Sequence, residues 1–119
     1  MEFYDCPVTA TLEVIGGKWK PIILYVLMSG TKRFGALAVR IPNISRKVLT
    51  EQLRELESDG LLIRRKYKEI PPRVEYTLTP EGKSLWDVFN EMAIWGNNNR
   101  RIVKKKLAMC KRQPFVFKQ

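Results

Sequence analysis

The sequence of 119 residues contains no histidine. Histidine is the commonest general base near neutral pH and a frequent zinc ligand, so its absence argues against acid–base catalysis and against a zinc site. Cysteine is scarce too: Cys6 and Cys110 stand near opposite ends of the chain and do not make a disulfide framework. We therefore expect no catalytic residues, no metal, no cofactor and no enzyme activity.

Long apolar runs are also missing. No segment approaches the roughly 20 apolar residues that span a bilayer, and residues 1–5 are too short and too acidic for a secretory signal. The adjacent glycines Gly16 and Gly17 fall in a link between two helical patterns rather than in a phosphate-binding loop. We expect a cytoplasmic protein with no membrane partner, folded as a single domain over residues 1–119.

Basic residues outnumber acidic ones by 22 to 12, and the formal net charge is +10. Residues 31–75 hold eleven basic and six acidic groups, whereas residues 100–119 hold eight basic groups and no acidic group. More than half of the excess therefore lies in a basic C-terminal extension, residues 97–119. This extension either binds flanking phosphates or forms a helix docked on a partner subunit through Ile102, Val103 and Leu107. Its alternation of apolar and basic residues favours the docked helix.

Two short helices joined by a turn are predicted between residues 33 and 60. The first has an apolar face at helical spacing, made by Phe34, Leu37, Ala38 and Ile41. Pro42 ends that helix, Ser45 is a good N-cap for the second, and Gly60 is a good C-terminal stop. The apolar face of the second helix is made by Leu49, Leu53 and Leu56. The pattern is that of a helix-turn-helix with its recognition helix at about residues 45–59.

A β-hairpin is predicted directly after the recognition helix, over about residues 61–79. Two alternating stretches flank the stiff pair Pro71–Pro72. A hairpin at this position is the wing of a winged helix. Its basic residues are Arg64, Arg65, Lys66, Lys68 and Arg73, against Glu69 and Glu75. This excess favours contact with phosphates, although it also fits a solvated hairpin whose charges only prevent edge-to-edge aggregation.

Several short motifs accompany these elements: Cys6-Pro7-Val8, residues 15–20 (Ile-Gly-Gly-Lys-Trp-Lys), Ile41-Pro42 with Ile44-Ser45, Asp59-Gly60-Leu61, residues 71–79 and Trp95-Gly96. With them, residues 6–96 resemble the HxlR family of bacterial winged-helix regulators. The resemblance implies a homodimeric transcriptional regulator on a roughly palindromic operator. The chain departs from the family at Gly35, where a polar helix former is common, and at Asn43, where glycine is common. Gly35 is expected to weaken its helix by about 1 kcal/mol relative to alanine.

The expected fold class is α+β and mainly helical, a winged helix-turn-helix with N- and C-terminal dimerisation helices. In this fold the exposed face of the recognition helix reads double-stranded DNA. The candidates for base edges are Arg46, Lys47, Thr50 and Arg54. Ser45, at the helix N-terminus, suits a phosphate, Arg33 suits the DNA backbone, and the basic wing residues suit phosphates or the minor groove. Glu51 either accepts from cytosine or only orients Lys47 or Arg54.

Apolar residues towards both ends of the chain predict a homodimer. An N-terminal helix has one apolar face, and Pro21 begins a second helix that is apolar almost all round, as a buried helix requires. Thr79 is the N-cap of a C-terminal helix rich in aromatic residues and methionine. These residues either form an interface or simply close the monomer core. The candidate interface residues are Val8, Leu12, Leu85, Trp86, Phe89, Met92 and Trp95.

Cys6 is a candidate redox sensor. It precedes a helix N-terminus, whose dipole lowers a thiol pKa, while the adjacent Asp5 opposes that shift. The residues alone fit an ordinary small buried cysteine as well. The resemblance adds weight to sensing, because in some HxlR members the N-terminal cysteine senses oxidants or electrophiles. Cys110 has no such support.

Two other classes of binding protein fit the sequence less well than a DNA-binding protein does. Winged helices also serve as protein–protein interaction modules without DNA binding, but such a module has an apolar recognition helix and a neutral wing. RNA binding needs aromatic stacking platforms among the basic residues, and only Tyr67 lies there. DNA binding is therefore favoured, with an effector, whether a small molecule or an oxidant, left unidentified.

Overall fold

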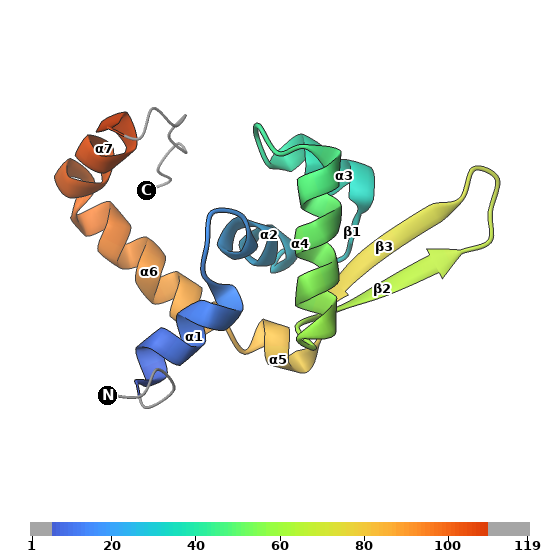
Figure 1. Ribbon diagram of the computed structural model, residues 1–119, viewed down its shortest axis with the longest axis horizontal. Helices are drawn as coiled ribbons and strands as arrows, with labels where there is room; N and C mark the ends of the chain where they lie inside the picture. The colour runs from blue at the N-terminus through green and yellow to red at the C-terminus, as the bar shows by residue number, and fades with distance from the viewer. Residues whose placement is uncertain (1–5, 110–119) are drawn as a thin grey trace. The chain divides into compact units, whose positions relative to one another are not determined.

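The computed structural model describes residues 6–109, which fall into two compact units divided in sequence between Trp86 and Asp87. The expected mainly helical α+β fold is confirmed. A single domain over residues 1–119 stays a prediction. The elements, labelled in Figure 1, are in chain order α1 (Pro7–Ile15), α2 (Lys20–Leu27), β1 (Lys32–Arg33), α3 (Phe34–Arg40), α4 (Arg46–Ser58), β2 (Leu62–Tyr67), β3 (Arg73–Leu78), α5 (Pro80–Lys83), α6 (Trp86–Asn98) and α7 (Arg100–Met109).

The first unit begins with two helices that differ in how much they bury. Helix α1 has Cys6 at its N-cap and buries only Ile15. The residues that α2 contributes to the core are Ile23, Leu24 and Leu27. The prediction that α2 is buried on all sides is wrong at Tyr25, which is 47% exposed. Its ring stacks on that of Trp86, with the ring centroids 6.5 Å apart, so this side of α2 is covered by an aromatic pair rather than by the core.

Helices α3 and α4 form the predicted helix-turn-helix. Ile41 ends α3 in an extended conformation, as Pro42 requires. Asn43 then takes a left-handed conformation, with φ 66°, which turns the chain towards α4. Ser45 is the N-cap of α4, and its hydroxyl accepts a hydrogen bond from the Val48 N–H at 3.1 Å. The buried residues of α4 are Leu49, Leu53 and Leu56, which fix the helix against α2 and β2 and leave its opposite face open.

The predicted wing is the antiparallel pair β2 and β3, with Leu62 opposite Leu78. In Figure 1 this hairpin extends away from α3 and α4. The sequence did not predict a third strand: β1 pairs with the other edge of β3, with Lys32 opposite Tyr76, so the strand order is β1-β3-β2. Strand β3 is therefore central, and its residues Tyr76 and Leu78 are buried.

The continuous C-terminal helix expected from Thr79 is wrong, because the structure breaks it into α5 and α6. The N-cap is as expected, since the Thr79 hydroxyl accepts from the Gly82 N–H at 3.1 Å. The Leu61 carbonyl accepts a hydrogen bond from the Thr79 N–H at 3.1 Å, and it lies so close to Gly82 that a Cβ there would clash with it. This position in the short helix α5 therefore requires glycine, although glycine is a poor helix former. Helix α6 then begins at Trp86.

The second unit contains α7 and all of α6 after Trp86. Asn99 separates the two helices: its side-chain amide donates to the Trp95 carbonyl at 2.9 Å, and its carbonyl accepts from the Ile102 N–H at 3.1 Å. The basic extension is thus helical as far as Met109. Among residues 6–109, no helix is long and apolar enough to cross a membrane. Outside the described residues lie Cys110, Lys111, Arg112 and Lys118.

Candidate nucleic-acid interface

The face of α4 that is turned away from the core carries the residues predicted to contact base edges. All four are exposed: Arg46, Lys47, Thr50 and Arg54. Within residues 6–109, neither Lys47 nor Arg54 makes an ion pair, so their charges are not compensated by the chain. Glu51 makes none either, so the suggestion that it orients Lys47 or Arg54 finds no support in the described contacts. Cationic side chains that are free along one face of a helix can donate hydrogen bonds to the guanine edges in the major groove.

Two hydroxyl groups on the DNA-facing side, those of Ser45 at the N-cap of α4 and of Thr50 within the helix, already make local hydrogen bonds. The Ser45 oxygen accepts from the Val48 N–H at 3.1 Å, which leaves its proton to donate outward. The Thr50 hydroxyl donates to the Arg46 carbonyl at 2.8 Å, so the methyl group is the part of Thr50 that remains for an outside contact. That arrangement suits a thymine methyl better than a hydrogen bond to a base.

Two side-chain contacts hold α4 in position relative to its neighbours. The Lys20 ammonium lies 3.1 Å from a Glu55 carboxylate oxygen, and the Lys20 side chain is only 12% exposed. The Arg46 guanidinium lies 5.7 Å from the centre of the Phe34 ring, which ties the first turn of α4 to α3. Arg46 therefore contacts the Phe34 ring while it stays exposed to solvent. Arg33, another predicted backbone contact, is exposed at the N-cap of α3 rather than inside that helix.

The basic wing residues divide between the two faces of the hairpin. Arg64 pairs with Tyr76 and Lys66 pairs with Val74, which puts these cations on the side of the sheet that faces α4. Arg65 pairs with Glu75 on the other side. Four wing cations are exposed: Arg64, Arg65, Lys66 and Lys68. Ile70, which was not a predicted site residue, is fully exposed in the loop between β2 and β3.

Arg73, the fifth predicted wing cation, is engaged within the chain. Its guanidinium makes ion pairs at 3.1 Å to Glu69 and at 3.6 Å to Glu75, and it lies 4.0 Å from the centre of the Tyr67 ring. The 3.6 Å contact of its Nε is an ion pair beyond hydrogen-bonding distance. The assignment of Arg73 to DNA contact stays a prediction, and the contacts of Arg73 with two carboxylates and a ring give it a role at the base of the wing loop as well.

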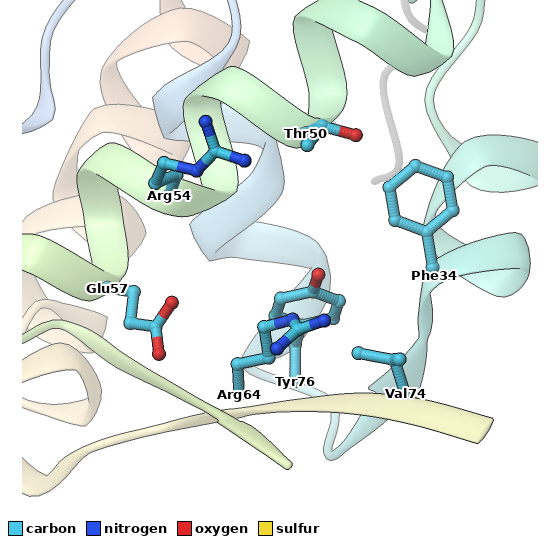
Figure 2. A pocket seen from close by; sticks show the side chains of 7 residues that line it. All are labelled: Phe34, Thr50, Arg54, Glu57, Arg64, Val74 and Tyr76. Atoms are coloured by element: carbon cyan, nitrogen blue, oxygen red, sulfur yellow. The ribbon is translucent and has the colours of Figure 1, made fainter. Parts of the chain in front are cut away.

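Two hollows adjoin this surface. One, of about 320 Å³, lies between α4 and the sheet and is shown in Figure 2; its lining residues are Phe34, Thr50, Arg54, Glu57, Arg64, Val74 and Tyr76. The other, of about 580 Å³, runs between the start of α3 and the wing loop at Glu69–Arg73. Tyr76 was not a predicted site residue, because a buried tyrosine on a central strand has the pattern of a core residue.

Cys6 is half-buried at the N-cap of α1. The Thr9 hydroxyl, followed by the backbone N–H groups of Thr9 and Val8, stabilises the thiolate and lowers the pKa of the Cys6 thiol, while burial opposes the shift. Of the two opposing influences named from the sequence, the N-terminal turn of α1 is the source of the lowered pKa, and the sensing role of Cys6 stays a prediction. Among residues 6–109, no group of three His, Cys, Asp or Glu side chains is placed to hold a metal ion.

The candidate dimer residues are mostly exposed. In the first unit, Val8 is 67%, Leu12 54% and Trp86 48% exposed, and Leu85 is half-buried. In the second unit, Met92 and Trp95 are 50% and 56% exposed. Phe89 differs from these residues, because it is only 4% exposed and packs inside the described chain. Its selection as an interface residue is not supported, since a buried ring offers little surface to a partner.

Comparison with known proteins identifies relatives of this chain. The model of the HxlR-like helix-turn-helix family matches residues 14–104. YdeP of Bacillus subtilis strain 168, an uncharacterized HTH-type transcriptional regulator, is 47% identical over 104 residues, which cover 87% of this chain and 81% of YdeP. The redox regulator HypR in its reduced form is 45% identical with a TM-score of 0.79, over 84% of this chain and 99% of HypR. The reduced transcriptional regulator YodB from B. subtilis is 40% identical with a TM-score of 0.69, over 79% of this chain and 94% of YodB.

Proposed function

Because the chain belongs to the HxlR-like helix-turn-helix family and is a transcriptional regulator rather than an enzyme, we propose that it binds a roughly palindromic DNA operator as a homodimer. The observation that carries the proposal is the exposed face of α4, where Lys47 and Arg54 have no ion-pair partner among residues 6–109. A protein–protein module would present apolar side chains there.

The contacts divide into base readout and backbone positioning. Lys47 and Arg54 read guanine edges in the major groove, and the Thr50 methyl packs on thymine. The Ser45 hydroxyl and the first-turn amides of α4 hold a phosphate, as helix N-termini do. Positioning on the DNA backbone falls to Arg33 and the free wing cations, Arg64, Arg65, Lys66 and Lys68. We also assign the exposed Ile70 in the wing loop to contact with a DNA groove.

The homodimer is proposed on the exposed apolar side chains near both ends of the chain. Val8 and Leu12 on α1, and Trp86, Met92 and Trp95 on α6, are about half exposed or more. Aromatic residues and methionine in such numbers are typical of interface cores. Two recognition helices related by a two-fold axis reach half-sites about one helical turn, ~34 Å, apart, which makes the operator palindromic.

A binding experiment tests this proposal. The duplex upstream of the protein's own gene and a shuffled duplex of equal length are titrated with the protein by fluorescence anisotropy at physiological salt. We expect selective binding of the first duplex with two chains per duplex, as read by light scattering of the complex. Lys47→Ala is expected to weaken this binding, whereas Lys83→Ala, at an exposed lysine on α5, serves as the control. Equal affinity for both duplexes contradicts sequence-specific regulation, and one chain per duplex contradicts the dimer.

We also propose that Cys6 makes DNA binding responsive to oxidants. Its lowered pKa raises the thiolate fraction at neutral pH, and HypR, a relative by sequence and fold, is a redox regulator. In the dimer, the two Cys6 thiols lose two protons and two electrons to an oxidant such as diamide, which becomes the hydrazine, and an S–S bond joins the subunits. The experiment compares DNA binding before and after diamide. A Cys6→Ser variant that still responds to diamide in full rules out this role for Cys6.

A further inference from the structure

The hollow between α4 and the sheet contains a tyrosine hydroxyl that the proposed DNA contacts do not use. Tyr76 is 5% exposed, and its ring belongs to the core on the central strand β3. In Figure 2 its hydroxyl points into the cavity. Within residues 6–109 this hydroxyl makes no hydrogen bond. This hydroxyl is therefore free to donate a hydrogen bond to a group that enters the cavity.

The charges around the cavity select a singly charged anion. Arg54 from α4 and Arg64 from β2 line it together with one carboxylate, Glu57. No ion pair among the described residues involves any of these three side chains. Two guanidinium groups and one carboxylate leave one positive charge. This single charge matches a monocarboxylate better than a phosphate dianion, and guanidinium groups bind carboxylates through two parallel hydrogen bonds.

The remaining walls are apolar and aromatic. Phe34 and Val74 lie on the side of the cavity opposite Glu57 in Figure 2, and the Tyr76 ring forms part of the lining. Neither Phe34 nor Val74 is exposed. Aromatic rings pack favourably on one another in offset or edge-on arrangements. A volume of about 320 Å³ lies at the small end of the range for ligand sites, which suits a molecule with one ring.

From this geometry we propose that the cavity binds a small aromatic monocarboxylate and that the bound molecule displaces DNA. The carboxylate accepts hydrogen bonds from Tyr76, Arg54 and Arg64, and the ring packs between Phe34 and Val74. The displacement rests on the proposed function, because Thr50, Arg54 and Arg64 are also the proposed DNA contacts. An arginine turned inward to a carboxylate is no longer available to a base or a phosphate. The ligand therefore acts as an inducer by competition.

Direct binding is tested on the full chain without DNA. Benzoate is the probe, and benzamide, which has the same shape without the charge, is the matched ligand. Backbone amide NMR shifts are followed on titration. We expect saturable shifts at Thr50, Arg54 and Val74 with benzoate, and at least tenfold weaker binding of benzamide. No saturable shift with benzoate, or equal binding of the two ligands, overturns the site.

The variant Tyr76→Phe separates this site from DNA readout, because it keeps the ring and removes only the hydroxyl. We expect it to bind benzoate about tenfold more weakly, to bind the operator as the wild type does, and to need correspondingly more benzoate to release DNA. Tyr25→Phe, at an exposed tyrosine outside the cavity, is the control. Unchanged benzoate affinity in Tyr76→Phe overturns the role of the hydroxyl. Saturable benzoate binding with no release of DNA overturns the competition. If the wild-type protein binds no operator, the proposed function is contradicted, and the benzoate titration still tests the cavity on its own.

Discussion

The Arg73 guanidinium lies 4.0 Å from the centre of the Tyr67 ring, across the mouth of the hairpin loop. Its neighbours Glu69 and Glu75 take up its positive charge, at 3.1 and 3.6 Å. These contacts join both strands of the wing at the point where they separate into the loop. Arg73, which the sequence assigns to phosphate binding, therefore also stabilises the base of the wing loop.

Replacing Arg73 and Lys68 distinguishes a structural cation from a DNA contact. Arg73→Ala is expected to lower the free energy of unfolding by ~1 kcal/mol, because a cation–π contact and partly exposed ion pairs are lost. Lys68→Ala is expected to leave stability unchanged and to reduce the salt slope of DNA binding by ~1. Urea unfolding and anisotropy over a salt series measure the two effects. If Arg73→Ala reduces the salt slope as much as Lys68→Ala does and leaves stability intact, Arg73 binds a phosphate after all.

Asn43 occupies a backbone position that favours glycine. Its φ of 66° places it in the left-handed region, which asparagine enters at small cost and which a Cβ-branched or alanine side chain enters at a cost of ~1–2 kcal/mol. Asn43→Gly is therefore expected to keep the midpoint of thermal unfolding, whereas Asn43→Ala lowers stability by ~1 kcal/mol. Calorimetry of the two variants checks this. An alanine variant as stable as the glycine variant contradicts the left-handed turn.

Gly35 occupies an ordinary helical position with room for a side chain. It lies in α3, it is exposed, and a Cβ added there meets no atom within 4 Å. Gly35→Ala is expected to stabilise the protein by ~1 kcal/mol, because glycine loses more backbone entropy on entering a helix. Denaturant unfolding measures the change. A destabilised alanine variant means that the start of α3 has another conformation.

The lowered pKa of Cys6 gives a prediction about pH. The Thr9 hydroxyl makes the largest contribution, so Thr9→Val is expected to raise the pKa of the thiol and to slow alkylation at neutral pH. The pKa of Cys6 is lower in the folded state than in the unfolded state, so the thiolate contacts stabilise the fold. This stabilisation is fully present above the unfolded pKa and is lost as the pH falls through the folded pKa. Iodoacetamide alkylation rates over a pH series locate the pKa in both proteins. Identical pH profiles exclude Thr9 as the cause.

Local signals in the sequence predicted the helix-turn-helix well. Pro42, Ser45 and Gly60 each act on the backbone next to them, so their effect on helix ends does not depend on the rest of the fold. The exposed face of α4 followed in the same way from helical spacing. The basic wing followed from alternation on either side of Pro71–Pro72.

Features that depend on distant contacts were missed. A strand of two residues, Lys32–Arg33, has no periodicity to detect and exists because β3 offers it an edge. The close approach of Gly82 to the Leu61 carbonyl joins segments that are far apart in the sequence. The neutralisation of Arg73 and the inward hydroxyl of Tyr76 depend on which side chains the folded sheet brings together. Charge counts along the sequence do not contain that information.

The central claim is that α4 reads base sequence, and Arg54 tests it most directly. Its guanidinium is exposed and without an ion-pair partner among residues 6–109. The measurement is the affinity of Arg54→Ala for the operator and for a random duplex, at one salt concentration. We expect a loss of ~1–3 kcal/mol on the operator and a much smaller loss on the random duplex, with relaxed specificity at one base pair of each half-site. An equal loss on both duplexes contradicts base readout by α4.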